Sequence, residues 1–206
     1  EQPPEEPPEQ VAPATAATGT GWGETPLSVQ WVWPSAISFE ERHQALKAFC
    51  EVLAKAWARF DHCGHPIEIG HTFQRQCLPG LLEQFNQSTP EGSQPMPWLA
   101  ALVCCSAFDL AVHDAYGVLH DCSVYDTYGP EHMSRDLRSY LEPADGAADV
   151  SFDGRYPSDY FDLPRSETLP AWHLVGGLDP LSAQDLSGDE AADGHPVLLA
   201  DWIKRD

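Results

Sequence analysis

The chain has 206 residues, of which 42% are hydrophobic and 21% charged, and its formal net charge is −21. This length and composition fit one large or two small domains with a buried core, and the seven tryptophans argue against wholesale disorder. The acidic excess lies mainly in residues 1–9, 142–167 and 179–193, which we expect to be solvated loops. Nucleic acid is not an expected partner, because phosphate binding needs a basic patch.

The sequence offers few targeting or redox signals. It has no run of about 18 apolar residues, so we expect no membrane span. Its N-terminus lacks the basic flank and apolar core of a signal peptide, and the absent initiator Met indicates a processed chain or a fragment. No C-x-x-C pair occurs, which disfavours a zinc ribbon. Four cysteines fall in apolar helical patterns and are expected to be reduced core thiols of a cytoplasmic protein: Cys50, Cys77, Cys104 and Cys105.

The first elements in chain order are a lead, a strand and a helix. Residues 1–18 are rich in Pro and Glu and then in Ala and Thr, so we expect them to be extended or disordered. Residues 19–27, GTGWGETPL, predict a strand leaving a glycine turn. Residues 38–60 predict the clearest helix, because Ser38 and Glu41 match the S-x-x-E capping box and apolar residues follow at three- and four-residue spacing.

The remaining elements alternate between helical patterns and loops. A second helical pattern runs from about residue 68 to 85, and Pro79 should kink or split it. Pro97 opens a third helix that we expect deep in the core, with Gly117 near its end. Residues 142–168 predict an acidic surface loop, residues 169–177 (LPAWHLVGG) a buried strand, and residues 195–206 the start of a helix.

The apolar third helix carries three titratable side chains, Asp109, His113 and Asp114. Asp109 and His113 are four residues apart, so they share one helix face and are able to ligate one metal ion. No third ligand is evident nearby. Hydrogen bonds to neighbouring loops and backbone amides are therefore the preferred interpretation.

Two further groups are candidates for a site. A small zinc-binding domain is one alternative, built from histidines around a cysteine: His62, Cys63, His65 and His71. Surface histidines in a loop are the simpler interpretation. Trp31 and Trp33 share one face if the backbone is extended, and we expect them to be core residues, with a pocket wall as the alternative. The G-x-S-x-G, Walker and G-x-G-x-x-G patterns are absent.

Residues 106–117, SAFDLAVHDAYG, resemble the conserved helix of the mandelate racemase/muconate lactonizing enzyme family in the enolase superfamily. The positions that carry the resemblance are Ser106, Ala107, Phe108, Asp109, Ala111, Asp114 and Gly117, followed by Ser123, Val124 and Gly129. GWGET, residues 21–25, is similar to the family's strand ending in G-x-G-E. Val118 and Thr127 depart from the pattern, which prefers a basic or amide residue and Leu there. The resemblance covers residues 19–129 and extends more loosely to 206.

The resemblance implies an α+β fold. Residues 19–141 would form an enolase-like cap of short antiparallel strands and a helical block. Residues 142–168 would be a loop, and residues 169–206 the first strand and helix of a truncated TIM-type barrel. The family removes a proton next to a carboxylate while Mg²⁺ holds the resulting intermediate. Its bases and metal ligands lie on later barrel strands, often with Lys-x-Lys on the second.

These expectations leave the chain without catalytic or metal-binding residues and without a cofactor of its own, while its parent protein would use Mg²⁺. The signature residues would be structural: Asp109, Ala111, Asp114 and Gly117. The parent would be a homo-oligomeric racemase, dehydratase or lactonizing enzyme acting on an acid-sugar-like carboxylate. Trp31, Trp33 and His173 are the expected specificity residues. The alternative is a non-catalytic helical binding or interaction module.

Overall fold

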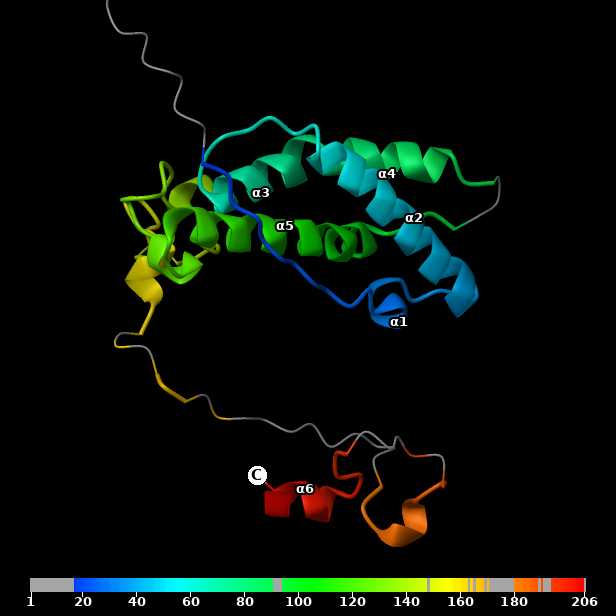
Figure 1. Ribbon diagram of the computed structural model, residues 1–206. Coiled ribbons are helices and arrows are strands. Elements are labelled where there is room, and N and C mark those ends of the chain that lie inside the picture. The colour runs from blue at the N-terminus through cyan, green and yellow to red at the C-terminus, as the bar shows by residue number, and fades with distance from the viewer. Residues whose placement is uncertain are drawn as a thin grey trace, which may run out of the picture. The chain divides into compact units, whose positions relative to one another are not determined.

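The computed structural model describes residues 17–90, 94–147, 149–162, 164, 166–168, 170, 180–188, 190 and 194–205. The chain divides into two compact units, Glu1–Phe161 and Asp162–Asp206. The first unit contains α1 (Val29–Val32), α2 (Phe39–Trp57), α3 (Pro66–Gln76), α4 (Leu78–Gln87), α5 (Trp98–His120), η1 (Val124–Thr127), η2 (Leu137–Ser139) and η3 (Pro157–Tyr160) (Figure 1). The second contains η4 (Ala183–Asp185) and α6 (Leu199–Arg205).

The expected α+β architecture is wrong for the part of the chain that the structure describes. Its regular elements are all helices, with neither a β-strand nor the start of a barrel. The strand expected at residues 19–27 is extended, but a strand also needs a ladder of backbone hydrogen bonds to a neighbour, and none is formed here. The strand expected at 169–177 lies outside the described residues, apart from Pro170.

Helix α2 begins where the sequence predicts. The Glu41 amide donates to Ser38 Oγ and the Ser38 amide donates to Glu41 Oε2, each at 3.2 Å, so the capping box is confirmed. The apolar stripe then buries Leu46, Phe49 and Leu53 completely. Helix α2 ends at Trp57, three residues before the predicted end.

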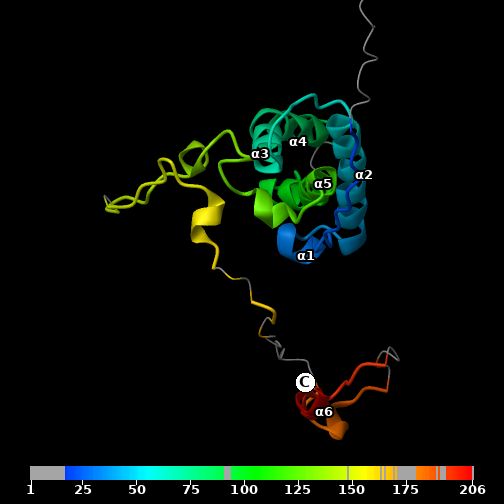
Figure 2. The ribbon, with the colours of Figure 1, turned by 60° about the vertical axis from the view of Figure 1, so that its left-hand side comes forward.

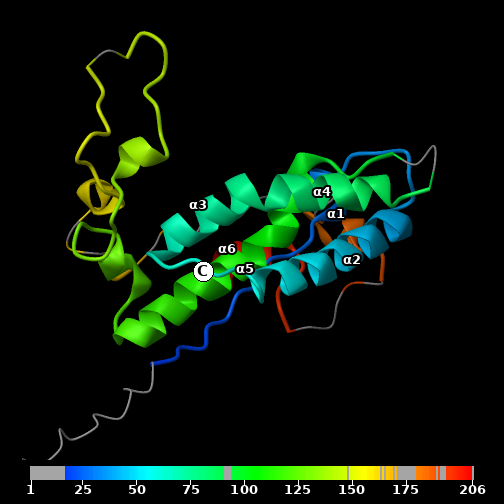
Figure 3. The ribbon, with the colours of Figure 1, turned by 90° about the horizontal axis from the view of Figure 1, so that it is seen from above.

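The second predicted helix is divided into α3 and α4, as Pro79 indicates. Cys77 separates them, and Pro79 lies in the first turn of α4, where its missing amide donor costs nothing. Helix α3 begins at Pro66, two residues earlier than predicted, because His65 caps it. Figure 3 shows α3 and α4 following one another alongside α5.

Helix α5 is the centre of the first unit, in contact with α1, α2, α3 and α4 (Figure 2). It presents buried small residues to the larger side chains of α2, namely Ala100, Ala101, Cys104 and Cys105. Small side chains let two helices approach closely, and the Cys104 thiol lies 3.6 Å from the Leu46 carbonyl oxygen. All six cysteines are free thiols.

By length and composition, α5 is also able to cross a membrane, and within the described ranges it is the helix that meets this criterion. The core helix of a soluble protein meets the same criterion. Helix α5 contacts four other helices and carries the polar side chains Asp109, His113 and Asp114, but only 22% of its most apolar stretch is buried, so it does not lie as deep in the core as the sequence predicts.

The segment of residues 18–28 runs extended along α5, and its residues alternate between exposed and partly buried (Figure 1). Gly19, Gly21 and Gly23 fall on the inward side. A Cβ atom at Gly21 would lie 2.2 Å from the Ala111 carbonyl oxygen, and one at Gly23 would lie 1.9 Å from that of Ala107. These helix atoms are backbone and cannot move aside. The glycines therefore allow this segment to lie directly on α5.

The second unit is small. Ser182 caps η4, with its amide donating to Asp185 Oδ2 at 2.8 Å. In α6, Lys204 pairs with Asp201 at 3.1 Å, and the Arg205 guanidinium lies 4.8 Å from the centre of the Trp202 ring. Helix α6 begins at Leu199, within the region where the sequence predicts a helix.

Candidate functional site

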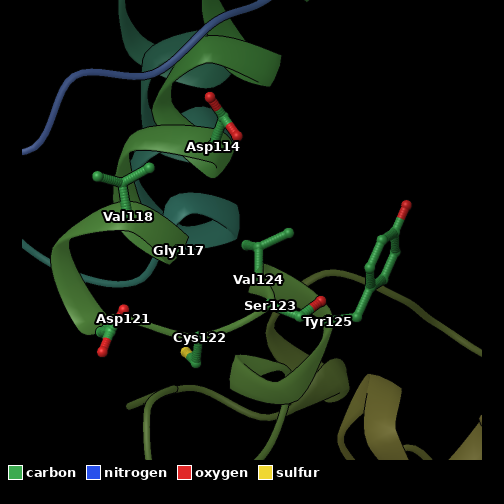
Figure 4. A pocket seen from close by; sticks show the side chains of 8 residues that line it. All are labelled: Asp114, Gly117, Val118, Asp121, Cys122, Ser123, Val124 and Tyr125. Atoms are coloured by element: carbon green, nitrogen blue, oxygen red, sulfur yellow. The ribbon is translucent and has the colours of Figure 1, made fainter.

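The C-terminal half of α5 meets η1, the start of α3 and the extended segment, and polar side chains gather there. A hollow of about 470 Å³ opens at this place, lined by Trp22, Gly23, Glu24, Asp109, Leu110, His113, Asp114, Val124, Tyr125 and Tyr128. A second hollow, of about 560 Å³, shares Asp114, Val124 and Tyr125 with the first. Figure 4 shows this second hollow, with Val124 between Asp114 and Tyr125 in that view.

Asp109, His113 and Tyr128 lie in a row at the wall of the first hollow, with a hydrogen bond between Tyr128 and His113 and a longer charge contact between His113 and Asp109. The Tyr128 hydroxyl lies 2.7 Å from His113 Nδ1, and His113 Nε2 lies 3.7 Å from Asp109 Oδ2. Burial raises the pKa of Tyr128 to about 12, so its phenol keeps its proton and donates to His113. The proton of neutral His113 then lies on Nε2, facing the carboxylate.

Burial also shifts the pKa values of both Asp109 and His113. It raises the pKa of Asp109, which the neighbouring His113 partly offsets, and it lowers the pKa of His113 against the attraction of Asp109. Gly70 of α3 makes room for the carboxylate, since a Cβ there would lie 2.0 Å from Asp109 Oδ1. The prediction that Asp109 and His113 share one helix face is confirmed.

His65 joins the start of α3 to η1. Its Nδ1 accepts a hydrogen bond from the Ile67 amide at 3.3 Å, so its proton lies on Nε2, which is 3.0 Å from Thr127 Oγ1. The Thr127 hydroxyl in turn donates to the Val124 carbonyl oxygen at 2.5 Å. Burial, followed by repulsion from His113, lowers the pKa of His65 to about 4. Thr127, which departs from the family pattern, therefore has a partner that a leucine would lack.

Glu68 fastens the segment after η1 to α3. Its Oε1 atom accepts from the Ser134 amide at 2.7 Å, from the Ser134 hydroxyl at 2.8 Å and from the Arg135 amide at 2.9 Å. Its Oε2 atom accepts from the His65 amide at 3.1 Å. Burial alone would raise the pKa of Glu68, but these hydrogen bonds outweigh it and lower the pKa.

The signature residues on α5 contact the GWGET segment and the turn after the helix. The Trp22 amide donates to Asp114 Oδ2 at 2.7 Å, and the hydroxyls of Thr25 and Ser106 lie 2.9 Å apart. Gly117 faces the returning chain, since a Cβ there would lie 2.9 Å from the Cys122 carbonyl oxygen. Ala111 lies beneath Gly21. These are contacts that hold the fold together.

The predicted specificity residues do not form one surface. Trp33 is buried at 4% exposure, and its carbonyl oxygen accepts from the Arg42 guanidinium, whereas Trp31 is 68% exposed on α1. The prediction that both belong to the core is therefore right for Trp33 and wrong for Trp31. Residues 29–32 are helical, so side chains two residues apart no longer share a face. His173 lies outside the described residues.

The proposed zinc ligands are dispersed. His65 is held by Thr127, His62 stacks on Phe60, and His71 packs edge-on against Tyr140. Within the described ranges, no group of three or more His, Cys, Asp or Glu side chains is arranged to hold a metal ion. The geometry thus gives no support to the zinc alternative.

Several residues of the polar site were missed by sequence reasoning. Glu68 and Ser134 are 66 residues apart, and no motif links them. One local signal marks the start of α3. A capping residue, His65, stands directly before Pro66, which occupies a favoured first helical position, and three residues before Glu68.

Comparison of the chain with protein-family models, with curated proteins and with solved structures finds no match in any of the three.

Proposed function

We propose that this chain is a non-catalytic, helical part of a larger enzyme of the mandelate racemase/muconate lactonizing kind. That enzyme would remove a proton next to the carboxylate of an acid-sugar-like substrate, with Mg²⁺ bound in a region other than this one. The helical unit would support and cover that region. On this proposal the chain by itself has no turnover.

One observation carries the proposal: the two separate segments that resemble the family are in direct contact. The Trp22 amide of GWGET donates to Asp114 of the helix signature, 92 residues away along the chain. Gly21 and Gly23 lie against Ala111 and Ala107 of the same signature. If the two short motifs resembled the family by chance, their residues would not be expected to contact one another.

The roles of the carboxylates agree with a structural part. Asp114 holds a backbone amide, and Asp109 lies between Gly70 and His113. A residue that stabilises the fold in this way is expected to be retained in an enzyme whose chemistry is performed elsewhere.

The coding sequence that follows Asp206 tests the proposal. If the reading frame continues, we expect a strand with a Lys-x-Lys pair and then carboxylates at the ends of later strands, as the resemblance implies. A continuation without these residues, or a stop codon directly after Asp206, would refute the proposal.

A helical interaction module is the second candidate, and exposed apolar side chains favour it. Trp22 is 86% exposed, and five large apolar side chains of α5 are also exposed: Trp98, Leu99, Leu110, Val118 and Leu119. An autonomous module should be monodisperse in size-exclusion chromatography with light scattering. A part removed from its larger enzyme should self-associate through these side chains.

A further inference from the structure

The hollow of about 470 Å³ combines aromatic rings with acidic side chains. Trp22, Tyr125 and Tyr128 supply the rings, and the Tyr125 and Tyr128 ring centres are 5.9 Å apart. Its carboxyl groups belong to Glu24, Asp109 and Asp114, and no Lys or Arg is among the lining residues. The volume is within the usual range for small-molecule sites, about 300–1,000 Å³.

The remaining polar groups of the hollow add no positive charge near neutral pH. Burial lowers the pKa of His113, so its imidazole is neutral and is engaged by Tyr128 on one side and by Asp109 on the other. Asp114 uses Oδ2 for the Trp22 amide, and a carboxylate has further acceptor positions for a ligand. The hollow therefore has a negative potential and several ring faces.

We propose that this hollow binds an organic cation, a guanidinium or alkylammonium group, between its aromatic rings and its carboxylates. A cation over the face of Trp or Tyr is attracted by the ring quadrupole. Carboxylates add charge-assisted hydrogen bonds, which a planar guanidinium is able to make in pairs. Trp22 and Tyr125 are 86% and 61% exposed, so a ligand reaches them directly from solvent.

This ligand differs from the substrate of the proposed parent enzyme. Three carboxyl groups without a cationic side chain repel a carboxylate ligand, so the hollow is unsuited to an acid sugar. The inference depends only on the lining residues and stands whether or not the proposed function is right.

The proposal is tested by titrating the purified chain with N-acetyl-L-arginine amide and measuring binding by NMR and calorimetry. The citrulline counterpart has the same shape without the charge, and tetramethylammonium distinguishes an ammonium from a guanidinium preference. We expect saturable binding of at least one cation, with shifts at the Trp22 indole and the Tyr125 ring, and at least tenfold weaker binding of the citrulline compound.

Matched variants separate the site from the general negative charge of the chain. Trp22→Ala and Glu24→Gln should each weaken binding at least fivefold. The controls are Trp31→Ala, another exposed tryptophan, and Glu51→Gln, an exposed acid on α2; both should stay within twofold of wild type. Equal binding of the citrulline compound, no saturable binding of either cation, or equal weakening by Glu51→Gln and Glu24→Gln would overturn the proposal.

Discussion

The two halves of α5 are held in place by different kinds of interaction. The N-terminal half buries Ala100, Ala101, Cys104 and Cys105 against the apolar stripe of α2. The C-terminal half instead carries Asp109, His113 and Asp114, each with a polar neighbour from its own turn or from a distant segment. One helix thus joins an apolar core to a polar site.

This difference separates two sources of stability. Close packing of apolar side chains depends on volume and is insensitive to pH. Hydrogen bonds of buried titratable groups depend on protonation, and an orphaned partner costs more than the bond itself contributes. Changes in the two halves of the molecule should therefore differ in size and in pH dependence.

The largest effect is expected in the apolar half, for Phe49→Ala. Phe49 is fully buried and contacts Phe85 edge-on at 5.1 Å between ring centres. Removing such a ring should lower the free energy of unfolding by about 3–5 kcal/mol. Urea denaturation measures it, with Phe39→Ala, half exposed on the same helix, as the control expected to lose less than about 1 kcal/mol. Similar losses from both variants would contradict this packing.

The polar site should respond next most strongly, to Glu68→Ala. This change leaves the Ser134 and Arg135 amides without their acceptor. We expect a loss of about 2–3 kcal/mol, with faster amide hydrogen exchange at residues near 134 and at His65, whose amide also donates to Glu68. Glu83→Gln, on an exposed position of α4, is the control and should be neutral. Unchanged exchange at Ser134 would show that Glu68 does not hold this segment.

The polar site should also lose stability in mild acid. The pKa of His65 is about 4 in the folded chain, against an ordinary value of 6.5, so the unfolded chain binds this proton first as the pH falls. The contribution of His65 is complete above about pH 6.5 and is lost between there and about pH 4. Glu68, whose pKa is lowered, gives the same sign at more acidic pH, below its ordinary value of 4.5. Thermal denaturation measured from pH 7.5 to 4 should show a falling melting temperature.

His65→Asn separates the histidine from the other acidic groups. Asparagine remains able to cap α3 but does not titrate, so the melting temperature of this variant should fall less steeply between pH 6.5 and 5. An unchanged slope would assign the acid sensitivity to other groups.

The smallest effect on global stability is expected for Gly23→Ala. Its new Cβ would lie 1.9 Å from the Ala107 carbonyl oxygen, so the extended segment must leave α5 while the helical core remains. We expect a loss of about 1 kcal/mol or less, together with lost protection of the Trp22 amide. Gly80→Ala, where a Cβ meets nothing within 4 Å, is the matched control. A cooperative loss of the whole fold would show that this segment belongs to the core.

The apolar half was predictable because local patterns determine it. Ser38 and Glu41 mark the start of α2, Pro79 marks the break between α3 and α4, and helical spacing identifies the buried faces. The strand prediction for residues 19–27 is right about the extended backbone only. A glycine-rich extended stretch does not specify a neighbouring strand to pair with, so the predicted sheet was wrong.

Contacts in the polar site at the C-terminal half of α5 were predictable only where both interacting residues lie on the same helix. The spacing of Asp109 and His113 places them together, whereas the contact of Tyr128 with His113 depends on how the chain turns back after α5. The acceptors on Glu68 likewise meet donors 66 and 67 residues away. Such pairs are formed by tertiary packing and leave no periodic signal in the sequence.

The central claim is that Asp109 and Asp114 hold the fold, while the proposed chemistry takes place outside this chain. The most direct test incubates the purified chain with Mg²⁺ and mandelate or an acid-sugar panel in D₂O and follows the proton next to the carboxylate by NMR. We expect no exchange above the rate measured without protein. Mg²⁺-dependent exchange that Asp109→Asn abolishes without unfolding the chain would contradict it.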